Sequence, residues 1–376
     1  MIRKLIRVLH VFLRRTFLEV PKQTKLLFID KSLTIQPSFY PEASTHKTRG
    51  RVLWDQFLQI VKYGAPEQFY FMYGFDTKSR KEMSQYMHLY PFMKIRTQMN
   101  LLSSHHNASC LLRNKLYFGF FAKCLGVKTG NNIALVTKNS VLRLTDKNWL
   151  TIDEFLKYYR GKLFCKKLDG ECGEDIFVLE LTDQLISING ETVTNVDVAK
   201  IVEKSTYLMQ ERVLQHHDMN RLYPKSLNTI RLVTIKNRLT GKIQVFPSNL
   251  RIGAHGSFVD NGSQGGIAVG FDLKTGRLYE YGLQKPPYGT KTKTHPDTGI
   301  EFSSFVIPFI KEAEEQAVFL HSMLDSIYSV GWDIAITENG PLFIEGNDNW
   351  ELQAIQRTHG GLKREFLEAL GINYNN

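Results

Sequence analysis

One stretch constrains the fold more than any other part of the chain, namely SVGWDIAITENGPLFIEGNDNW at residues 329–350. Two short apolar runs, Trp332–Thr337 and Leu342–Ile344, flank the tripeptide Glu338-Asn339-Gly340. This pattern predicts a β-hairpin, because glycine supplies the positive φ angle that a tight turn between two strands needs.

The length of the turn decides which side chains face one another across this hairpin. A two-residue Asn-Gly turn would set Asp333 opposite Gly346, whereas a three-residue loop would pair Thr337 with Pro341 and set Asp333 opposite Glu345. We expect the second register, because a type I turn closed by a left-handed glycine suits a loop of this composition.

In that register Asp333, Glu345 and Asn347 share one face, because facing residues and residues two apart on a strand point to the same side. Two carboxylates and an amide oxygen form the oxygen-only kind of site that Mg²⁺ prefers. The alternative is a surface hairpin whose charges face water. The apolar neighbours of both carboxylates argue against it, since a lone charge among apolar groups is costly. This stretch alone leaves both interpretations open.

The composition is that of an ordinary soluble globular protein. The 376 residues are 43% apolar and 23% charged, which allows one to three domains. No apolar run approaches the roughly 18 residues that a membrane-spanning helix needs. Four scattered cysteines without paired metal-ligand spacing indicate a reduced, cytoplasmic protein. The net charge of +11 favours anionic partners such as nucleotides, phosphorylated or uronic sugars, membrane surfaces or nucleic acid.

Much of the positive charge lies at the start of the chain. Apolar side chains at helical spacing are interspersed there with five basic residues, Arg3, Lys4, Arg7, Arg14 and Arg15. Residues 1–17 are therefore predicted to form a basic amphipathic helix. This helix could dock on its own domain or make peripheral contact with the inner face of a membrane. Its apolar character is interrupted too early for a secretory signal.

The first region with recognisable chemistry lies well inside the chain. Residues 1–105 show no chemical motif and are predicted to form an N-terminal, mainly helical region, and Lys115 begins an apolar helical segment after it. The segment LFCKKLDGECGEDIFVLE then predicts two strands joined by a loop that contains Gly170 and Gly173. Lys166 ends the first strand, so its ammonium and the backbone N–H groups of the loop could meet phosphates. The spacing is not that of a P-loop.

A third apolar strand, Tyr207–Met209, runs into the polar segment 210–214. Backbone that leaves a strand in this way can contact an adenine ring through its C=O and N–H groups. His216 and His217 follow directly. Adjacent side chains on a strand point to opposite faces, so we interpret these histidines as structural and not as a chelating pair.

Two later strands each carry an arginine among apolar neighbours. Arg231 lies in the predicted strand Leu227–Lys236 and Arg251 in the predicted strand Gln244–Gly253. Arginines within strands are seldom buried without an anion or a carboxylate as a partner.

Two further segments lead toward the hairpin. Phe258–Gly270 is rich in Gly, Asn and Ser, and is predicted to be a loop that could bring backbone close to a ligand. Val306–Val330 is predicted to form one long amphipathic helix that ends at the hairpin.

The order of these parts resembles the ATP-grasp superfamily, and most closely its sugar-transfer-associated family. The likeness is carried by NTIRLVT (228–234), LRIG (250–253), VDN (259–261) with GG (265–266), and VGWDIAITENGPLFIEGN (330–347). It covers roughly residues 111–362, and the last of these strings is highly specific. The resemblance implies an α+β ATP-grasp fold, in which two α+β subdomains clasp a nucleotide behind an N-terminal helical extension.

The resemblance also suggests boundaries for these parts. The ATP-grasp domain would cover residues 106–376, with an ATP-binding flap subdomain at about 128–212 and a metal-binding subdomain at about 213–365. ATP and Mg²⁺ are the cofactors that such a domain implies. Lys115 and Lys166 would contact the α- and β-phosphates.

The remaining site residues receive roles from the same resemblance. The loop Gly170–Gly173 would cover the phosphates, while Glu211 and Val213 would meet the adenine edge. Mg²⁺ would be held by three residues of the hairpin, Asp333, Glu345 and Asn347. Arg231 and Arg251 would stabilise the charge on the transferred phosphoryl group, or would bind a carboxylate or phosphate of the acceptor.

Most enzymes of the superfamily phosphorylate a carboxylate to an acyl phosphate, which an amine then captures. The resemblance thus implies a carboxylate–amine ligase that forms ADP and phosphate, with small-molecule or glycan-precursor substrates of cell-surface polysaccharide biosynthesis. The sequence does not separate a carboxylate from a hydroxyl acceptor, so a kinase that phosphorylates a sugar-type acceptor is the alternative. A binder of membrane surfaces or nucleic acid would leave the hairpin carboxylates unexplained, and no specific nucleic acid is expected.

The chain departs from the family pattern at two places. Asn347 is followed by the segment 348–351, Asp-Asn-Trp-Glu, where many members have a small residue and then Pro-Gly. Because this end shapes the acceptor pocket in the family, the identity of the acceptor stays open. Lys167 stands where the family usually has Pro.

Overall fold

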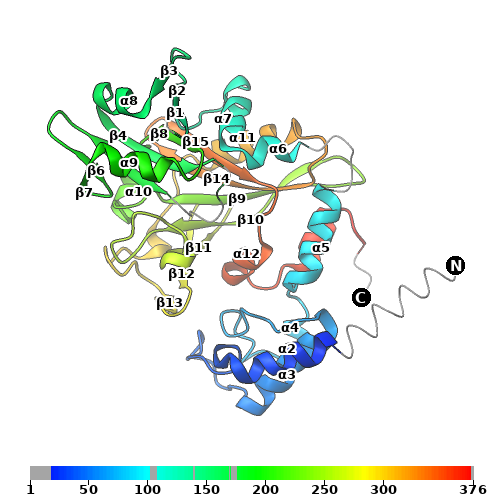
Figure 1. The fold of residues 1–376 in the computed structure, drawn as a ribbon. Helices are drawn as coiled ribbons and strands as arrows, with labels where there is room; N and C mark the ends of the chain where they lie inside the picture. Colours follow the sequence, from blue (N-terminus) through cyan, green and yellow to red (C-terminus); the bar gives the residue numbers. More distant parts are fainter. Residues whose placement is uncertain (1–17, 102–107, 139, 169, 171–175, 374–376) are drawn as a thin grey trace.

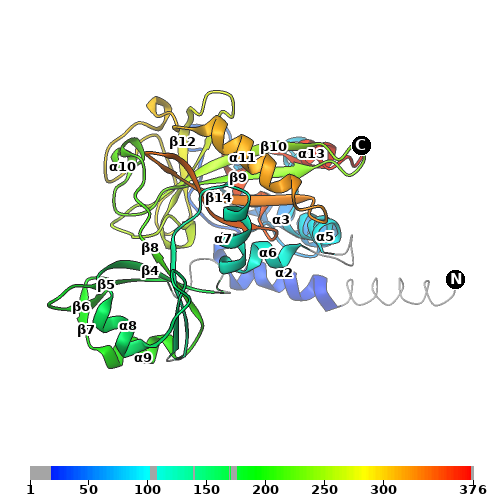
Figure 2. The same ribbon diagram turned by 90° about the horizontal axis from the view of Figure 1, so that it is seen from above.

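Two antiparallel β-sheets organise the protein in the computed structural model, which describes residues 18–101, 108–138, 140–168, 170 and 176–373 (Figure 1). The predicted basic helix over residues 1–17 lies outside the described residues. One sheet has eight strands and the other has seven. Seen from above, the lobe that carries the eight-stranded sheet stands to one side of the rest of the protein (Figure 2).

The eight-stranded sheet forms the flap lobe. Its strand order is β3-β2-β1-β8-β4-β5-β6-β7. The elements of the lobe are β1 Asn132–Thr137, β2 Ser140–Arg143, β3 Trp149–Thr151, α8 Ile152–Tyr158, β4 Gly161–Lys167, β5 Phe177–Leu181, β6 Ile186–Ile188, β7 Glu191–Val193, α9 Asn195–Val202 and β8 Tyr207–Glu211. Both helices begin with a capping box, at Thr151 with Glu154 and at Thr194 with Asp197, and their apolar faces pack on the sheet.

The seven-stranded sheet forms the core of the second lobe, with the strand order β13-β12-β11-β10-β9-β14-β15. Its strands are β9 Thr229–Lys236, β10 Ile243–Ile252, β11 Ile267–Phe271, β12 Leu278–Gln284, β13 Lys291–Thr292, β14 Ser329–Thr337 and β15 Gly340–Asn347. Its helices are α6 Ser109–Arg113, α7 Lys115–Cys124, α10 His217–Leu222, α11 Ile310–Ser322, α12 Leu352–His359 and α13 Lys363–Ala369, with single 3₁₀ turns at Gly262–Gln264 and Phe302–Ser304.

The alternation of side chains along β9 assigns a different role to each face of this sheet. Ile230 and Leu232 face the core that α7 and α11 cover. Val233 and Ile235 face the opposite layer, which includes side chains of α12 and α13. Arg231 is on the same side as Val233, because residues two apart on a strand share a face. On this face, the part of β9 that carries Arg231 is therefore polar, and the apolar layer covers only the rest of the strand.

The N-terminal region is mainly helical, as predicted. It contains α2 Val20–Ile29, a 3₁₀ turn at Lys31–Leu33, α3 Arg49–Tyr63, α4 Arg80–Met83 and α5 Leu89–Asn100. The region is tied to α12, since Met87 N donates to the Gln356 side chain at 2.8 Å and Tyr73 Oη donates to Gln353 O at 3.4 Å. Leu283 of β12 also packs into its core.

The central hairpin has the predicted pairing of carboxylates but a different turn. Asp333 lies opposite Glu345, as expected. Thr337 pairs with Gly340, so the turn has two residues and the predicted three-residue loop is wrong. The Thr337 hydroxyl stabilises the tighter turn by donating to Gly340 O at 2.8 Å. A one-residue slip between Asp333 and Ile334 then restores the predicted register, because a bulge adds one residue to one strand.

The predicted helix over residues 306–330 is too long. The helix α11 covers only Ile310–Ser322. Pro308 disfavours helical backbone at the residue before it, and Phe309 adopts a left-handed conformation with φ of 53°. Val306 instead forms an isolated bridge to Arg277. The predicted loop 258–270 is also too long, since its last residues belong to β11.

Two observations concern the cellular setting. Among the described residues, no helix combines the length and the apolar character that spanning a bilayer requires. Cys110, Cys124 and Cys165 are free thiols.

A buried histidine connects α11 to the sheet through a chain of hydrogen bonds. Trp332 Nε1 donates to Thr234 Oγ1 at 2.8 Å, and Thr234 Oγ1 lies 2.8 Å from His321 Nδ1. His321 Nε2 lies 3.0 Å from Ile327 O, which can only accept, so Nε2 carries the proton and Nδ1 accepts from Thr234. Burial lowers the pKa of His321 from 6.5 to about 4.

This neutral histidine predicts a loss of stability in acid. The unfolded chain protonates His321 near pH 6.5 and the folded protein only near pH 4, so the free energy of unfolding falls as the pH decreases between these values. The loss from this residue amounts to about 3 kcal/mol. Urea unfolding at pH 7 and pH 4.5 measures it. His321→Gln cannot titrate and should lose less stability over this interval; an equal loss in both proteins would contradict the assignment.

Candidate functional site

A row of polar side chains crosses the open end of the core sheet. Glu345 on β15 lies opposite Asp333 on β14, which lies opposite Arg231 on β9, which lies opposite Asn249 on β10. Asn347 is two residues from Glu345 and donates to its Oε1 at 3.2 Å. The three predicted metal ligands therefore converge on one face, together with a predicted arginine.

Asp333 is the centre of this row. Arg231 holds it in a bidentate pair, with Nε–Oδ1 at 2.6 Å and Nη2–Oδ2 at 3.1 Å. Arg251 adds an ion pair from its Nη2 to Oδ2 at 2.6 Å. Burial opposes ionisation of the carboxyl, but the two guanidinium groups outweigh burial and hold the pKa of Asp333 well below its usual range. Asp333 is thus a carboxylate at any physiological pH.

Arg251 is positioned by two residues that sequence reasoning did not single out as site residues. Its Nη2 donates to Thr229 Oγ1 at 2.9 Å, and its Nε lies 3.9 Å from Asp260 Oδ2. Asp260 in turn accepts from Thr229 N at 3.1 Å and from the Thr229 hydroxyl. Thr229 precedes Arg231 by two positions, so strand alternation was the signal that could have identified it.

Two lysines approach the carboxylates from other elements. Lys115, at the start of α7, donates from Nζ to Gly170 O at 2.6 Å in the loop that follows β4. Lys166, at the end of β4, has its pKa lowered by burial, an effect that Glu345 and Asp333 oppose. Both predicted phosphate-binding lysines are therefore gathered near the hairpin carboxylates. Gly173 lies outside the described residues.

Glu345 and Asp333 differ in electrostatic environment although they are neighbours. Burial, together with the Asp333 carboxylate, raises the pKa of Glu345, whereas Lys115 and Lys166 oppose that rise. Asp333 has two guanidinium partners and Glu345 has none at similar range. Glu345 is accordingly the carboxylate that would gain most from a further cation.

The donor atoms fit a magnesium ion. Carboxylate oxygens of Asp333 and Glu345 and the amide oxygen of Asn347 are the hard ligands that Mg²⁺ takes, and no guanidinium among the described residues pairs with the partly buried Glu345. Both oxygens of Asp333 already accept hydrogen bonds from arginines. Each carboxylate oxygen has a second lone pair, so a metal on Asp333 would share an oxygen with a guanidinium group.

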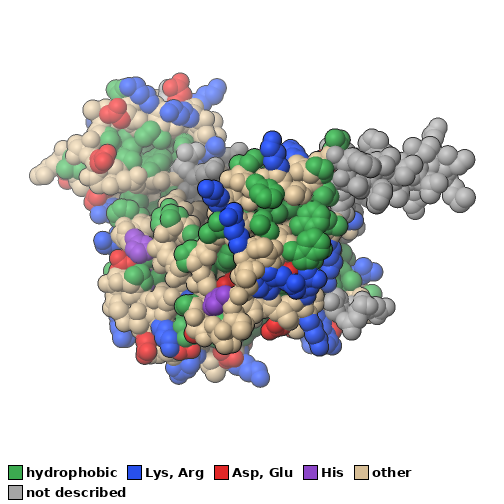
Figure 3. All heavy atoms as spheres, turned by 90° about the horizontal axis from the view of Figure 1, so that it is seen from below, with side chains coloured by type: hydrophobic (Ala, Val, Ile, Leu, Met, Phe, Trp, Pro, Cys, Tyr) green, Lys and Arg blue, Asp and Glu red, His purple; other side chains and the backbone are tan. Residues whose placement is uncertain are grey.

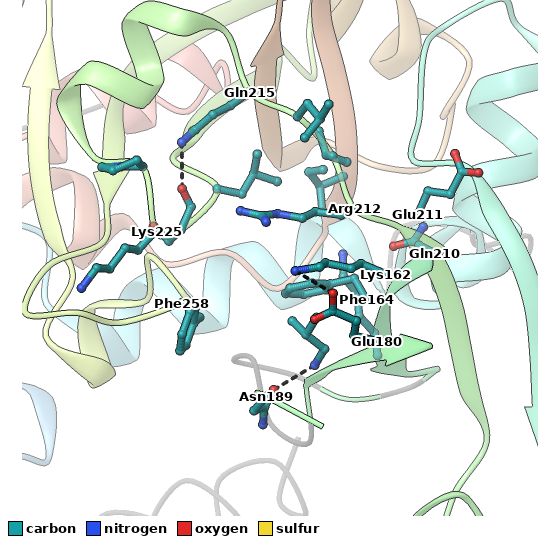
Figure 4. Close-up of a pocket in the computed structure, with 18 of the residues that line it drawn as sticks. Lys162, Phe164, Glu180, Asn189, Gln210, Glu211, Arg212, Gln215, Lys225 and Phe258 are labelled. Atoms are coloured by element: carbon teal, nitrogen blue, oxygen red, sulfur yellow. Dashed lines mark hydrogen bonds and ion pairs between the residues drawn. The ribbon is translucent and has the colours of Figure 1, made fainter. Parts of the chain in front are cut away.

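A cavity of about 380 Å³ opens between the two lobes beside these residues (Figure 4). The flap lobe contributes Phe164, Lys166 and Val178, and the core lobe contributes Ile344 and Phe258. The connecting segment 210–214 forms part of the wall. Glu211 and Val213, the two residues expected at the adenine edge, both line the cavity. The Glu211 side chain points away from the cavity in Figure 4, which leaves its backbone on the cavity side.

The two histidines after this segment do not lie on a strand, so the predicted opposite orientation is wrong. His216 caps α10 and His217 begins it. Their rings lie 4.1 Å apart, and His217 Nδ1 lies 3.1 Å from Glu338 Oε1 at the hairpin turn. The helix start turns both rings to one side and ties the connecting segment to the hairpin.

The segment that departs from the family pattern is fixed by arginines of the preceding region. Arg113 makes a bidentate pair with Asp348, at 3.0 and 2.8 Å. Arg96 donates to Asn349 and to the carbonyl of Trp350. Trp350 packs against Gly331, where a Cβ atom would lie 2.7 Å from the Cβ of Trp350. These contacts bring a bulky side chain beside the polar row.

Two α+β lobes that clasp a cavity next to converging lysines and carboxylates define the ATP-grasp class of fold. The sequence family described as sugar-transfer associated ATP-grasp matches residues 94–369, and the chain belongs to this family. The predicted family and fold class are therefore confirmed. A comparison with curated protein sequences gave no match.

Several solved structures also resemble part of this chain. An ADP complex of purK, N5-carboxyaminoimidazole ribonucleotide synthetase, is 13% identical with a TM-score of 0.38, over 64% of this chain and 46% of that one. N5-carboxyaminoimidazole synthetase from Staphylococcus aureus with ADP is 14% identical with a TM-score of 0.41, over 75% and 59%. The VanG D-Ala:D-Ser ligase from Enterococcus faecalis is 12% identical with a TM-score of 0.40, over 70% and 63%. The chain spans less than two thirds of these structures, so the family assignment rests on the sequence match.

The central ion pairs predict that the two hairpin carboxylates differ in their effect on stability. Asp333→Asn leaves Arg231 without a counter-charge and Arg251 with only the more distant Asp260, and it should lower the free energy of unfolding by about 3 kcal/mol, since both guanidinium groups keep some contact with solvent. Glu345→Gln should cost less than about 1 kcal/mol, because this carboxyl is already disfavoured as a charge. Chemical denaturation of both variants measures the difference, and equal costs would contradict the assigned pairing.

Proposed function

We propose that the protein is an ATP- and Mg²⁺-dependent ligase that activates a carboxylate as an acyl phosphate for capture by an amine. The observation that carries the proposal is the convergence of Asp333, Glu345, Asn347, Arg231 and Arg251 on the sheet with Lys115 and Lys166 beside a cavity between the lobes. Family membership supports ATP as the phosphoryl donor.

Each group of residues has a task in this proposal. The backbone of Glu211 and Val213 borders the cavity and would meet the adenine edge. Lys115 and Lys166 would neutralise the α- and β-phosphates, with Gly170 in the covering loop. Glu345, Asn347 and Asp333 would hold Mg²⁺, which when bound would neutralise charge on the phosphate oxygens.

The arginines would act on the transferred group. An acceptor carboxylate oxygen attacks the γ-phosphorus, the bond to the bridging oxygen breaks, and ADP leaves. The amine then attacks the acyl carbon, releases phosphate and loses a proton. Asp333 aims Arg231 and Arg251 at the open end of the sheet, where they would stabilise charge on the phosphoryl group or orient the acceptor. Their pairing fixes the geometry before the substrates bind.

The family description and the distribution of charge suggest the setting. The association with sugar transfer leads us to propose a role in cell-surface polysaccharide biosynthesis, with substrates drawn from glycan precursors in the cytoplasm. On the face shown in Figure 3, Lys and Arg side chains occur over both lobes and not in a single stripe. This face therefore presents no continuous basic track for a nucleic-acid backbone among the described residues.

Two substitutions test the nucleotide site. Lys166→Ala should weaken ATP binding about tenfold or more, because a buried ammonium is lost from the phosphates. Lys167→Ala, at the next position on the same strand, is the matched control and should bind nearly as wild type. Isothermal titration with the non-hydrolysable analogue AMP-PNP gives the affinities. Equal affinities in the two variants would remove Lys166 from the site.

Glu345→Gln should lower metal-dependent turnover by about 10² or more while the protein stays folded, because a carboxylate that would hold the metal is lost. ADP release is measured against a panel of amino acids and uronic or nucleotide sugars. Product analysis then separates the two chemistries: carboxylate-dependent release of phosphate with a new amide supports the ligase, and a phosphorylated hydroxyl supports a kinase. An unaltered ATPase rate in Glu345→Gln would refute the metal assignment.

A further inference from the structure

One arginine near the site has a buried N–H group that none of the described residues accepts. Arg231 and Arg251 bind Asp333, Arg113 binds Asp348, and Arg96 donates to backbone and amide oxygens. Arg357 on α12 is partly buried, and its Nε is fully buried without a hydrogen-bond acceptor. Over the ranges that the structure describes, no residue forms a hydrogen bond or an ion pair with this guanidinium.

The surroundings of Arg357 include a second cation and an aromatic ring. Its Cζ lies 5.3 Å from the centroid of the Phe69 ring, and Lys285 Nζ lies 5.7 Å from the same centroid. Burial lowers the pKa of Arg357, and the nearest opposing influences are the Tyr73 hydroxyl and Glu351. The N-terminal region and the ATP-grasp domain thus place two cations around one aromatic ring.

These cations border the proposed acceptor side of the catalytic row. Asn249, which lies opposite Arg231, donates from Nδ2 to Ala354 O on α12 at 3.1 Å, and its Oδ1 is buried without a partner. On the other side, Lys285 Cε lies 3.9 Å from the position of a Cβ on Gly262, in the loop that follows Asp260. The elements that carry Arg357 and Lys285 therefore contact elements that carry or support the proposed catalytic residues.

An unpaired, partly buried guanidinium is costly in a folded protein. Its Nε–H group loses its hydrogen bond to water, and no acceptor among the described residues replaces it. Buried polar groups without partners are uncommon and are expected where a ligand supplies the missing contact. A guanidinium presents paired N–H groups that match the two oxygens of a carboxylate or a phosphate.

We propose that Arg357, with Lys285 beside the same ring, binds an oxyanion carried by the acceptor. The inference rests on the proposed function in one respect, namely that the bound molecule is the acceptor. Binding of an oxyanion at Arg357 can be tested without that assumption. Arg357 lies five residues after the start of α12, about 8 Å along its axis, so it contacts a part of the ligand remote from the transferred phosphoryl. The acceptor is therefore an anionic sugar or sugar phosphate.

Three variants test this assignment in the full-length chain. Arg357→Met removes the charge, Arg357→Lys keeps the charge without the paired N–H groups, and Arg364→Met removes an exposed arginine that pairs with Glu368. The probes are glucuronate, glucose 6-phosphate and neutral glucose. Titration calorimetry is run with saturating MgADP, so that nucleotide and not the probe occupies the lysines of the cavity.

We expect wild type to bind at least one anionic sugar about tenfold or more tighter than glucose. Arg357→Met should lose that preference, Arg357→Lys should retain part of it, and Arg364→Met should bind as wild type. Binding of glucuronate alone identifies a carboxylate as the oxyanion, and binding of glucose 6-phosphate alone identifies a phosphate. Thermal unfolding gives a second readout: removal of an uncompensated charge should leave the Tm of Arg357→Met equal to or above that of wild type.

No preference for either anionic sugar in wild type, or unchanged binding in Arg357→Met, would overturn the proposal. A lower Tm with unchanged sugar binding would assign Arg357 a structural role instead. A different outcome would contradict the proposed function alone. In that outcome MgADP does not bind wild type, while Arg357 still determines the binding of an anionic sugar.

Discussion

A single buried carboxylate holds the functional end of the core sheet together. Asp333 accepts two hydrogen bonds from Arg231 on a neighbouring strand. It also forms an ion pair with Arg251, one strand further away. Three strands are thereby fixed relative to one another at the point where the apolar layer ends. Without Asp333, two guanidinium groups would face each other in a poorly solvated place, which is why the rest of the site depends on it.

The same pairing explains how charge is divided within the site. Asp333 has its counter-charge inside the protein, so it positions arginines even before any ligand binds. Glu345 faces the same space, but only the two lysines moderate its burial. One carboxylate therefore organises the protein, and the other is available to a cation that arrives with the nucleotide. This division follows from the strands and helices around the hairpin, which bring the arginines to Asp333 and the lysines to Glu345.

The N-terminal region takes part in the architecture and is more than an appended extension. Arg96 helps to fix the segment after the hairpin, Met87 is bound by glutamines of α12, and Phe69 lies under Arg357. Because these contacts surround the acceptor side, the region belongs to the wall against which a second substrate would lie. The unpaired charge at Arg357 is understandable in that position, where an anionic ligand could complete the site.

The sequence determined the kinds of groups and much of their order. Alternation along the hairpin strands placed Asp333, Glu345 and Asn347 on one face, glycine marked the hairpin turn, and the motif strings identified the family, because local backbone preferences and side-chain periodicity act over a few residues. Only the tertiary structure decided the two-residue turn with its bulge, the early end of α11 and the shared side of His216 and His217. It also decided that Thr229 and Asp260 support Arg251 and that, within the described part of the chain, nothing accepts a hydrogen bond from the Arg357 Nε. Those features depend on contacts between segments far apart in the chain, which no local pattern encodes.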